Sequence, residues 1–334
     1  MKKILILFSI FLCSILMSGC GKEDKKTVLN KFEKKVNNTN GYQMEAEMEL
    51  INNEDSYKYD VTVSYKKKNN YRVSLRNKTN NHEQVILKNN DGVYVLSPRL
   101  NKSFKFQSKW PFNNSQSYLV QSILNDMKSD TNLSMKKTSK SYVFKSTVNY
   151  KNNASLTYQE ITLDKNYNIK KVIVYNKDDI AQIKVNFKSV DMKAKFNDDY
   201  FELEENMETS LQNEQTKNQT KELEEAVYPM YLPDGTYLET EKTVELDEGS
   251  RVILTFAGTS SFMLVEESVN KSDELTVVPT SGVIDLFADV IAIIGDSSVS
   301  WISGDVEYYL VSSDISKEEL LNVAKSISVM PVSK

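Results

Sequence analysis

The chain has 334 residues, with 42 lysines and arginines against 46 aspartates and glutamates, and it contains one histidine and two cysteines. So few histidines and cysteines argue against a zinc centre and against a catalytic triad, because both need several such side chains. No recognition motif for DNA or RNA is present, and no pattern indicates a metal or a cofactor, so neither is expected. The composition therefore favours a protein that binds over one that catalyses.

The first residues predict a secretory signal. Two lysines precede an apolar run at residues 4–17, and small residues then lead to Cys20. The run is too short for a membrane-spanning helix, which takes about 20 residues, so residues 1–19 are predicted to be a signal peptide. The Ser-Gly-Cys end resembles a bacterial lipobox, although Met17 stands where leucine is commoner. The alternative is an ordinary signal that is cleaved elsewhere, with Cys20 a free thiol.

The lipobox resemblance implies that signal peptidase II cleaves before Cys20 and that the thiol of Cys20 carries a diacylglycerol. Two acyl chains are enough for stable membrane anchoring. Cys13 would leave with the signal, so the mature chain would have no disulfide and no thiolate nucleophile. We therefore expect a lipoprotein anchored on the extracytoplasmic face of the cell membrane, with residues 20–26 as a polar tether.

The charge is divided unevenly along the rest of the chain. Residues 21–206 hold 32 basic and 23 acidic side chains, a net charge of +9, whereas residues 227–334 hold 6 and 18, a net charge of −12. Such asymmetry indicates two units, and we predict one domain at 27–206, a polar linker at 207–226 and a small α+β domain at 227–334. The basic half could lie against anionic lipid or wall polymer. Alternatively, it is a solvated surface rich in lysine and asparagine.

The first unit is predicted to be mostly β. Residues 27–38 have apolar side chains at helical spacing, and the chain then changes to the strict alternation of half-buried strands, of which we expect about ten. Pro98 predicts a turn between two antiparallel strands, and Trp110-Pro111 ends the second of them. The spacing then returns to a helical period, which predicts a second amphipathic helix at 117–129.

An antiparallel sheet with one wet face needs a cover for its other face. The two amphipathic helices can serve as that cover, so the predicted fold is α+β and mostly antiparallel β, a curved half-barrel closed by helices. The segment that joins the sheet to the second helix, with the apolar stripe of that helix, is the candidate ligand- or partner-binding surface: Trp110, Pro111, Tyr118, Leu119, Ile123, Leu124 and Met127. The alternative is that these side chains are core.

The second unit is predicted to contain short strands and one helix. Residues 250–268 indicate a hairpin around Gly258. The apolar side chains at 283–294 fit either strands or a helix, and their β-branched content favours strands. A capped helix is expected at 315–327, in which Ser316 and Glu319 form a capping box.

Residues 89–124 combine a Val-Tyr strand, a proline turn, Trp110-Pro111 and a Ser-Gln-Ser-Tyr-Leu helix start. This segment resembles a family of sporulation and germination lipoproteins of Firmicutes. Residues 28–205 as a whole resemble the LolA/RseB lipoprotein-localisation fold. Trp301 and residues 307–327 are similar to a small domain of unknown function that often follows such half-barrels.

The resemblance implies three different functions, because such relatives bind lipoprotein acyl chains, sense envelope stress or support a cortex amidase. Our first hypothesis is a non-enzymatic lipoprotein that acts in sporulation or germination by binding a cell-wall-modifying partner, such as an N-acetylmuramoyl-L-alanine amidase. The alternative is a carrier or envelope-stress sensor that holds acyl chains in the half-barrel. An enzyme is least favoured, since His82 lies in a predicted turn and paired carboxylates such as Glu266-Glu267 lie near element ends, where charge is usually solvated.

Overall fold

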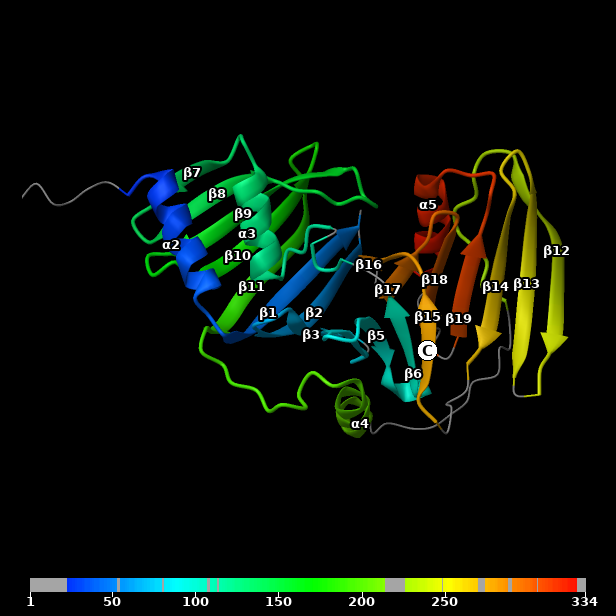
Figure 1. Cartoon of the computed structure of the whole chain (residues 1–334). Coiled ribbons are helices and arrows are strands. Elements are labelled where there is room, and N and C mark those ends of the chain that lie inside the picture. Colours follow the sequence, from blue (N-terminus) through cyan, green and yellow to red (C-terminus); the bar gives the residue numbers. More distant parts are fainter. Residues whose placement is uncertain are drawn as a thin grey trace, which may run out of the picture.

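The computed structural model describes residues 23–52, 55–79, 81–106, 109–112, 114–213, 226–247, 249–269, 274–287, 290–304 and 306–328. Cys20 and the predicted signal peptide lie outside these residues. Two largely antiparallel sheets, one of twelve strands and one of seven, dominate the described chain, and few helices accompany them (Figure 1). The expectation of a mostly antiparallel β protein is therefore confirmed.

The larger sheet follows from the alternation in the sequence. In β1, Tyr42, Met44 and Met48 are buried, whereas Glu47 and Glu49 point to the opposite side and pair with lysines. The strand order is β15-β6-β5-β4-β3-β2-β1-β11-β10-β9-β8-β7. The bounds are β1 Gly41–Asn52, β2 Asp55–Lys66, β3 Asn70–Asn77, β4 Glu83–Lys88, β5 Val93–Ser97, β6 Lys102–Phe106, β7 Ser134–Lys137, β8 Ser141–Thr147, β9 Leu156–Asp164, β10 Ile169–Asn176 and β11 Ala181–Asp191, with a short 3-10 turn at Pro98–Leu100.

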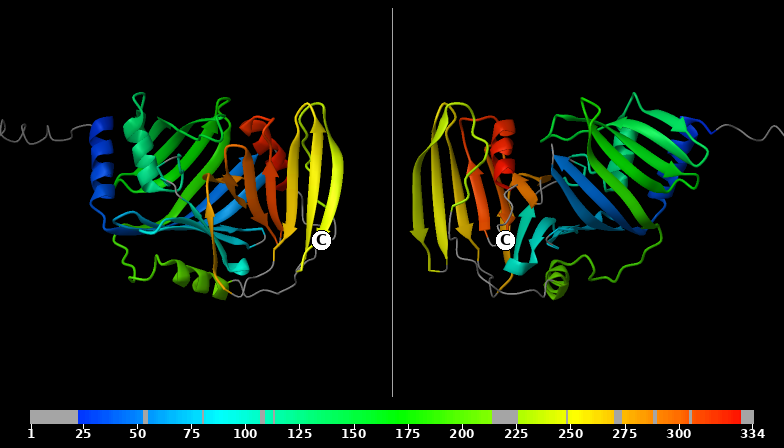
Figure 2. Two further views of the ribbon diagram at one scale, coloured as in Figure 1. Left: turned by 45° about the vertical axis from the view of Figure 1, so that its right-hand side comes forward. Right: turned by 180° about the vertical axis from the view of Figure 1, so that it is seen from behind.

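Two helices lie on one face of this sheet, and both had been predicted (Figures 1 and 2). Helix α2 (Lys25–Asn37) begins after Asp24, whose side chain accepts a hydrogen bond from Thr27 N at 2.8 Å. Helix α3 (Val120–Ser129) begins later than the predicted start at 117, because Leu119 has an extended backbone. The apolar stripes of α2 and α3 belong to the same buried cluster as the inward side chains of the strands.

The opposite face carries a helix that the sequence analysis missed. After β11 the chain turns back beneath the sheet and forms α4 (Leu203–Asn213), which takes up the first part of the expected linker (Figure 1). A small apolar cluster holds this segment against the sheet: Val85, Leu87, Tyr94, Leu96, Phe201, Leu203 and Met207.

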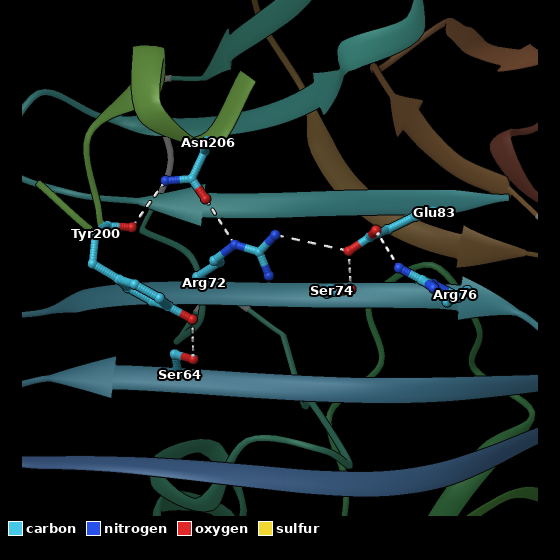
Figure 3. A network of polar contacts seen from close by, with 7 residues as sticks. All are labelled: Ser64, Arg72, Ser74, Arg76, Glu83, Tyr200 and Asn206. Carbon is cyan, nitrogen blue, oxygen red and sulfur yellow. Dashed lines mark hydrogen bonds and ion pairs between the residues drawn. The ribbon is translucent and has the colours of Figure 1, made fainter. Parts of the chain in front are cut away.

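Beside that cluster lies a polar network, which we call the clamp: Ser64, Arg72, Ser74, Arg76, Glu83, Tyr200 and Asn206 (Figure 3). Glu83 accepts hydrogen bonds from Ser74 Oγ and from Arg76 Nη2, the latter at 2.9 Å. Arg72 Nη2 lies 3.7 Å from Glu83 Oε1, and Arg72 Nε donates to Asn206 Oδ1 at 2.7 Å. Because Asn206 belongs to α4, the clamp ties this helix to strands β3 and β4.

Several elements predicted for the C-terminal half occur in or beside the smaller sheet. Its order is β12-β13-β14-β19-β18-β17-β16, and β13 and β14 form the expected hairpin. Residues 283–287 and 290–294 form strands and not a helix. Ser316 Oγ accepts from Glu319 N at 3.2 Å at the start of α5 (Lys317–Ser328). The strands are β12 Thr236–Glu245, β13 Ser250–Gly258, β14 Phe262–Ser268, β16 Val283–Phe287, β17 Val290–Ile294, β18 Ser298–Ser303 and β19 Val306–Val311.

The C-terminal half contributes one strand to the larger sheet. Strand β15 (Thr276–Thr280) pairs with β6 in parallel, the one parallel pairing within the described sheets (Figure 1). Further contacts join the halves, among them a hydrogen bond and an ion pair: Gln84 Oε1 accepts from Ile291 N at 2.8 Å, and Lys102 Nζ lies 2.6 Å from Glu307 Oε2. The division at 206 and 227 stays a prediction, and β15 crosses it by pairing with the first unit.

Candidate functional site

Two adjoining cavities lie where the two halves meet. We call them the apolar cavity, of about 40 Å³, and the polar cavity, of about 110 Å³. Their walls come from β1, β11, β16 and β17, from α5, and from the loops before α3 and between β8 and β9. Five side chains line both cavities and make them neighbours: Leu50, Tyr150, Ile183, Asp285 and Leu286.

Hydrogen bonds between two loops shape the wall of the apolar cavity. Ser115 N donates to Asn149 O at 3.0 Å, and Asn149 N donates to Ser115 Oγ at 2.8 Å. Such short polar side chains satisfy backbone groups that irregular segments cannot pair in a ladder. The bonds hold the segment before α3 beside the loop between β8 and β9, and each contributes a tyrosine to the wall, Tyr118 and Tyr150.

Most of the other side chains that line the apolar cavity are hydrophobic, and Trp110 among them packs against Tyr71. Trp110 is 1% exposed, and its ring meets the ring of Tyr71 edge-on, with centroids 5.7 Å apart and an interplanar angle of 83°. Aliphatic side chains complete the wall: Met48, Leu50, Ile86, Ile183, Ile284, Leu286 and Ile291. A group that enters this cavity would therefore exchange water for aliphatic and aromatic contacts.

Two side chains of opposite charge line the polar cavity. Asp285 accepts hydrogen bonds from Asn152 Nδ2 at 3.3 Å and from Leu286 N at 2.9 Å, and it forms no ion pair within the described residues. Burial raises the pKa of Asp285, and attraction to Lys325 opposes that shift. Burial likewise lowers the pKa of Lys325, which extends from α5. Both charges are thus partly stripped of water at one cavity.

The structure buries the side chains of the predicted binding surface. Leu119 and Ile123 are 0% exposed and Leu124 is 5% exposed, and Met127 and Pro111 are buried as well. Two of the seven, Trp110 and Tyr118, line the apolar cavity. The role of the seven in binding stays a prediction, and their burial supports the alternative that most of them are core.

Sequence analysis missed the charged part of the site. Asp285, Lys325 and Asn152 come from three separate elements, and no local pattern brings them together. The available signal was the single aspartate within the apolar stretch Val-Ile-Asp-Leu-Phe of β16.

Glu266 departs from the sequence interpretation in a similar way. It was expected near an element end in water, but it is 0% exposed on the inner side of β14. Its carboxylate accepts from Val227 N at 2.9 and 3.1 Å, and burial raises its pKa to about 7. Its neighbour Glu267 points outward and pairs with Arg251 at 2.6 Å. The sequence analysis was therefore wrong to place Glu266 in water, whereas Glu267 does lie near the surface.

Metal chemistry finds no support in the part of the chain that the structure describes. No three His, Cys, Asp or Glu side chains gather there in a way that could hold a metal ion. In the same residues, no helix is long and apolar enough to span a membrane.

Comparison of the whole sequence with known proteins assigns the family. Residues 1–201 match the family model described as sporulation protein YdcC-like, and residues 226–327 match a domain of unknown function, DUF4367. Sporulation protein YdcC of Bacillus subtilis (strain 168) is 33% identical over 327 residues, which is 98% of this chain and 97% of that protein. The chain belongs to the YdcC-like sporulation protein family. The resemblance that residues 89–124 indicated is thereby confirmed.

Solved structures give weaker similarity to this YdcC-like protein. MucB is 14% identical with a TM-score of 0.36, over 92% of this chain and 98% of MucB. The GerS lipoprotein complex with the CwlD amidase from Clostridioides difficile gives 18% identity and a TM-score of 0.31, over 53% of this chain and 98% of that chain. At these scores the structural matches carry no weight of their own, so the assignment rests on the sequence matches.

Proposed function

We propose that this YdcC-like protein is a membrane-anchored, non-enzymatic sporulation protein that acts by binding a cell-wall-modifying enzyme, such as a cortex amidase. The observation that carries this proposal is the 33% identity to a sporulation protein across 98% of the chain. A diacylglycerol on Cys20 would hold the protein at the outer face of the cytoplasmic membrane, beside the wall polymer on which such enzymes act.

The inside of the fold supports partner binding over the alternative of an acyl-chain carrier or envelope-stress sensor. We propose that α2 and α3 close the half-barrel as a permanent cover, since Val28 and Ile123 are 0% exposed and lie in one continuous cluster with the strands. An acyl chain could enter that space only if α3 moved away. Such a movement would expose Leu119, Ile123 and Met127 to water, which is costly.

The test is a deletion strain complemented with defined alleles. We expect its spores to lack the amidase-dependent modification of the cortex, and the wild-type gene to restore it. The Cys20→Ala protein should fail to restore it, whereas Cys13→Ala, whose substitution lies in the predicted signal peptide, should succeed. A normally modified cortex in the deletion strain would contradict the sporulation partner, and full rescue by Cys20→Ala would contradict the anchor.

A second experiment addresses the partner directly. The full-length protein in lipid nanodiscs is mixed with the purified cortex amidase of the same organism, and association is measured by light scattering. We expect a stable complex, because the proposal requires direct binding. Separate particles at micromolar concentrations of both proteins would contradict the amidase as partner.

A further inference from the structure

The predicted lipid anchor is attached next to a surface rich in lysine. We propose that this surface, formed by the outward side of α2 and two adjacent turns of the larger sheet, lies against anionic lipid headgroups and so sets the orientation of the whole molecule on the membrane. This inference rests on the anchor at Cys20 in the proposed function, and it does not depend on the amidase as partner.

The tether is too short to hold this surface far from the membrane. Glu23 is fixed to the body of the fold. Tyr167 Oη donates to its carboxylate at 2.6 Å, and Tyr142 Oη and Lys31 Nζ donate to the same group. Cys20 stands three residues before Glu23, and an extended chain advances at most about 3.6 Å per residue. An acylated Cys20 at the headgroups therefore keeps the Cα atom of Glu23 within about 11 Å of its own.

Six lysines surround this point, on α2, at the end of β7 and in the turns that follow β7 and β9: Lys26, Lys31, Lys34, Lys137, Lys140 and Lys165. We call this set the basic face. The rings of Tyr142 and Tyr167 stack at its centre, 6.0 Å apart. The ammonium groups of Lys165 and Lys137 lie 4.0 Å and 6.0 Å from the centroid of the Tyr142 ring. On α2, Lys26 is exposed on the side opposite the buried stripe. The lysines therefore share one end of the fold.

The carboxylates at this end do not cancel the charge of the basic face. Glu23 pairs with Lys31, and Asp24 caps the start of α2. Asp164, in the turn after β9, lies 3.8 Å from a further lysine, Lys170. The remaining lysines of the basic face outnumber these acidic groups, so the surface keeps a net positive charge.

The far end of the molecule carries the opposite charge. The seven-stranded sheet lies farthest from α2 (Figures 1 and 2), and residues 227–334, which supply that sheet, have a net charge of −12. A lysine near an anionic membrane surface strengthens binding about fivefold, whereas acidic side chains are repelled from it. Both effects turn α2 toward the lipid and the C-terminal half away from it.

The first experiment is flotation of the mature chain, residues 20–334, with Cys20→Ala. No lipid is then attached, so neither the anchor nor the amidase affects the result. Vesicles of phosphatidylcholine are compared with vesicles that also contain phosphatidylglycerol. We expect binding to the anionic vesicles alone and its loss at high salt, because salt screens the attraction. Equal binding to both vesicles, no binding to either, or binding to an anionic wall polymer but not to the vesicles would overturn the proposal.

Variants then locate the contact. Lys26→Glu with Lys140→Glu reverses two charges of the basic face and should weaken binding to the anionic vesicles at least about thirtyfold. Lys151→Glu with Lys177→Glu makes the same change in net charge in the loops after β8 and β10, at the other ends of the strands. This control should weaken binding less than about threefold, because the two positions are farther from the membrane than the Debye length. All four side chains are exposed, so folding should be unaffected. Equal losses for the two pairs would overturn the assignment.

A final measurement uses the lipidated protein in nanodiscs that contain phosphatidylglycerol. A nitroxide is attached at Asn30→Cys on the outward side of α2, or at Thr243→Cys on β12, both exposed positions. We expect the label at position 30 to be relaxed by lipid-soluble oxygen and the label at position 243 by a water-soluble nickel chelate. Two labels that are equally in water would overturn the orientation. A protein that does not enter nanodiscs would contradict the anchor at Cys20, and flotation would still decide whether the basic face binds lipid.

Discussion

Two buried carboxylates, one in the larger sheet and one in the smaller, lie in very different surroundings. Glu83, in the clamp, is 7% exposed and accepts hydrogen bonds from Ser74 and Arg76, with Arg72 close by. Asp285, at the cavities, has amide partners and no described ion pair. The carboxylate of Glu83 has a hydroxyl and two arginines around it, whereas that of Asp285 has two hydrogen bonds and the attraction of Lys325 and Lys317.

The pKa values express the same difference. Burial alone would raise the pKa of Glu83, but the hydrogen bond from Ser74 and the two arginines outweigh it, so the pKa lies below its ordinary value. Burial raises the pKa of Asp285, and its few partners do not cancel that effect. A buried charge whose partners outweigh its burial is typical of a structural tie, whereas a charge whose burial outweighs its partners contributes little to stability. The clamp and the cavities are therefore expected to respond to mutation in opposite ways.

The largest effect is expected at the clamp. Glu83→Gln leaves Arg72, whose side chain is 12% exposed, without its carboxylate, and this should lower the free energy of unfolding by about 3 kcal/mol. Because the folded pKa of Glu83 is depressed, its contribution is present at neutral pH and lost as the pH falls through the folded pKa. Urea unfolding at neutral pH measures it.

Two controls sharpen this test of the clamp. Glu47→Gln removes a carboxylate that pairs with Lys78 and Lys188 at the surface, and it should have a clearly smaller effect. Arg72→Met in the Glu83→Gln background should recover part of the stability, since it removes the orphaned charge. Equal losses for Glu83→Gln and Glu47→Gln would show that the clamp is no stronger than a surface pair.

The next largest effect is a gain in stability, in contrast to the loss at the clamp, and it is expected at Glu266. Burial raises its pKa to about 7 from 4.5, so the folded state binds the proton more tightly than the unfolded state. Its contribution to stability is greatest below the unfolded pKa and declines as the pH rises to the folded pKa. Glu266→Gln keeps an acceptor for Val227 N and should stabilise the protein by about 2 kcal/mol above neutral pH. Thermal unfolding between about pH 4 and pH 8 checks it, and a pH-independent difference would refute this explanation.

A smaller gain is expected at the cavity. Asp285→Asn removes a buried charge whose partners do not cancel the effect of burial, while keeping an acceptor for Asn152 Nδ2, so it should raise the free energy of unfolding by about 1 kcal/mol at neutral pH. The loss of attraction to Lys325 keeps this gain small. Chemical unfolding at neutral pH measures it. A loss comparable with that of Glu83→Gln would mean that both carboxylates are structural ties.

The spacing of apolar residues and the positions of turn-forming residues were enough to predict much of this fold. The alternation at Tyr42, Met44 and Met48 placed one face of β1 in the core, and the β-branched side chains at 283–294 gave strands where a helix also fitted. These features are local, because side-chain direction follows directly from the backbone period. The same holds for the cap at Ser316.

The elements that sequence reasoning missed depend on distant partners. Helix α4 lies in a polar stretch, and it is held by Arg72 and by the apolar cluster beneath it, neither of which is near in sequence. Strand β15 pairs in parallel with β6, far away in the chain, and it contains Pro279, a residue type that cannot donate to a strand ladder. The cavities arise at this same long-range junction, and local patterns gave no reason to name Asp285 and Lys325, which come from separate elements.

The smallest effect is expected where a charged pair joins the halves near the surface. Lys102 Nζ lies 2.6 Å from Glu307 Oε2, with side chains 20% and 29% exposed. Because solvent screens such a pair, Lys102→Met should cost less than about 1 kcal/mol, and the cost should shrink at high salt. Glu307→Gln and the double variant complete a cycle, measured by thermal unfolding, that isolates the pair itself. A coupling energy as large as that between Glu83 and Arg72 would mean that the junction relies on charge. A small coupling energy would mean that uncharged contacts hold the halves together, chiefly β15, the Gln84–Ile291 hydrogen bond and the shared apolar cluster.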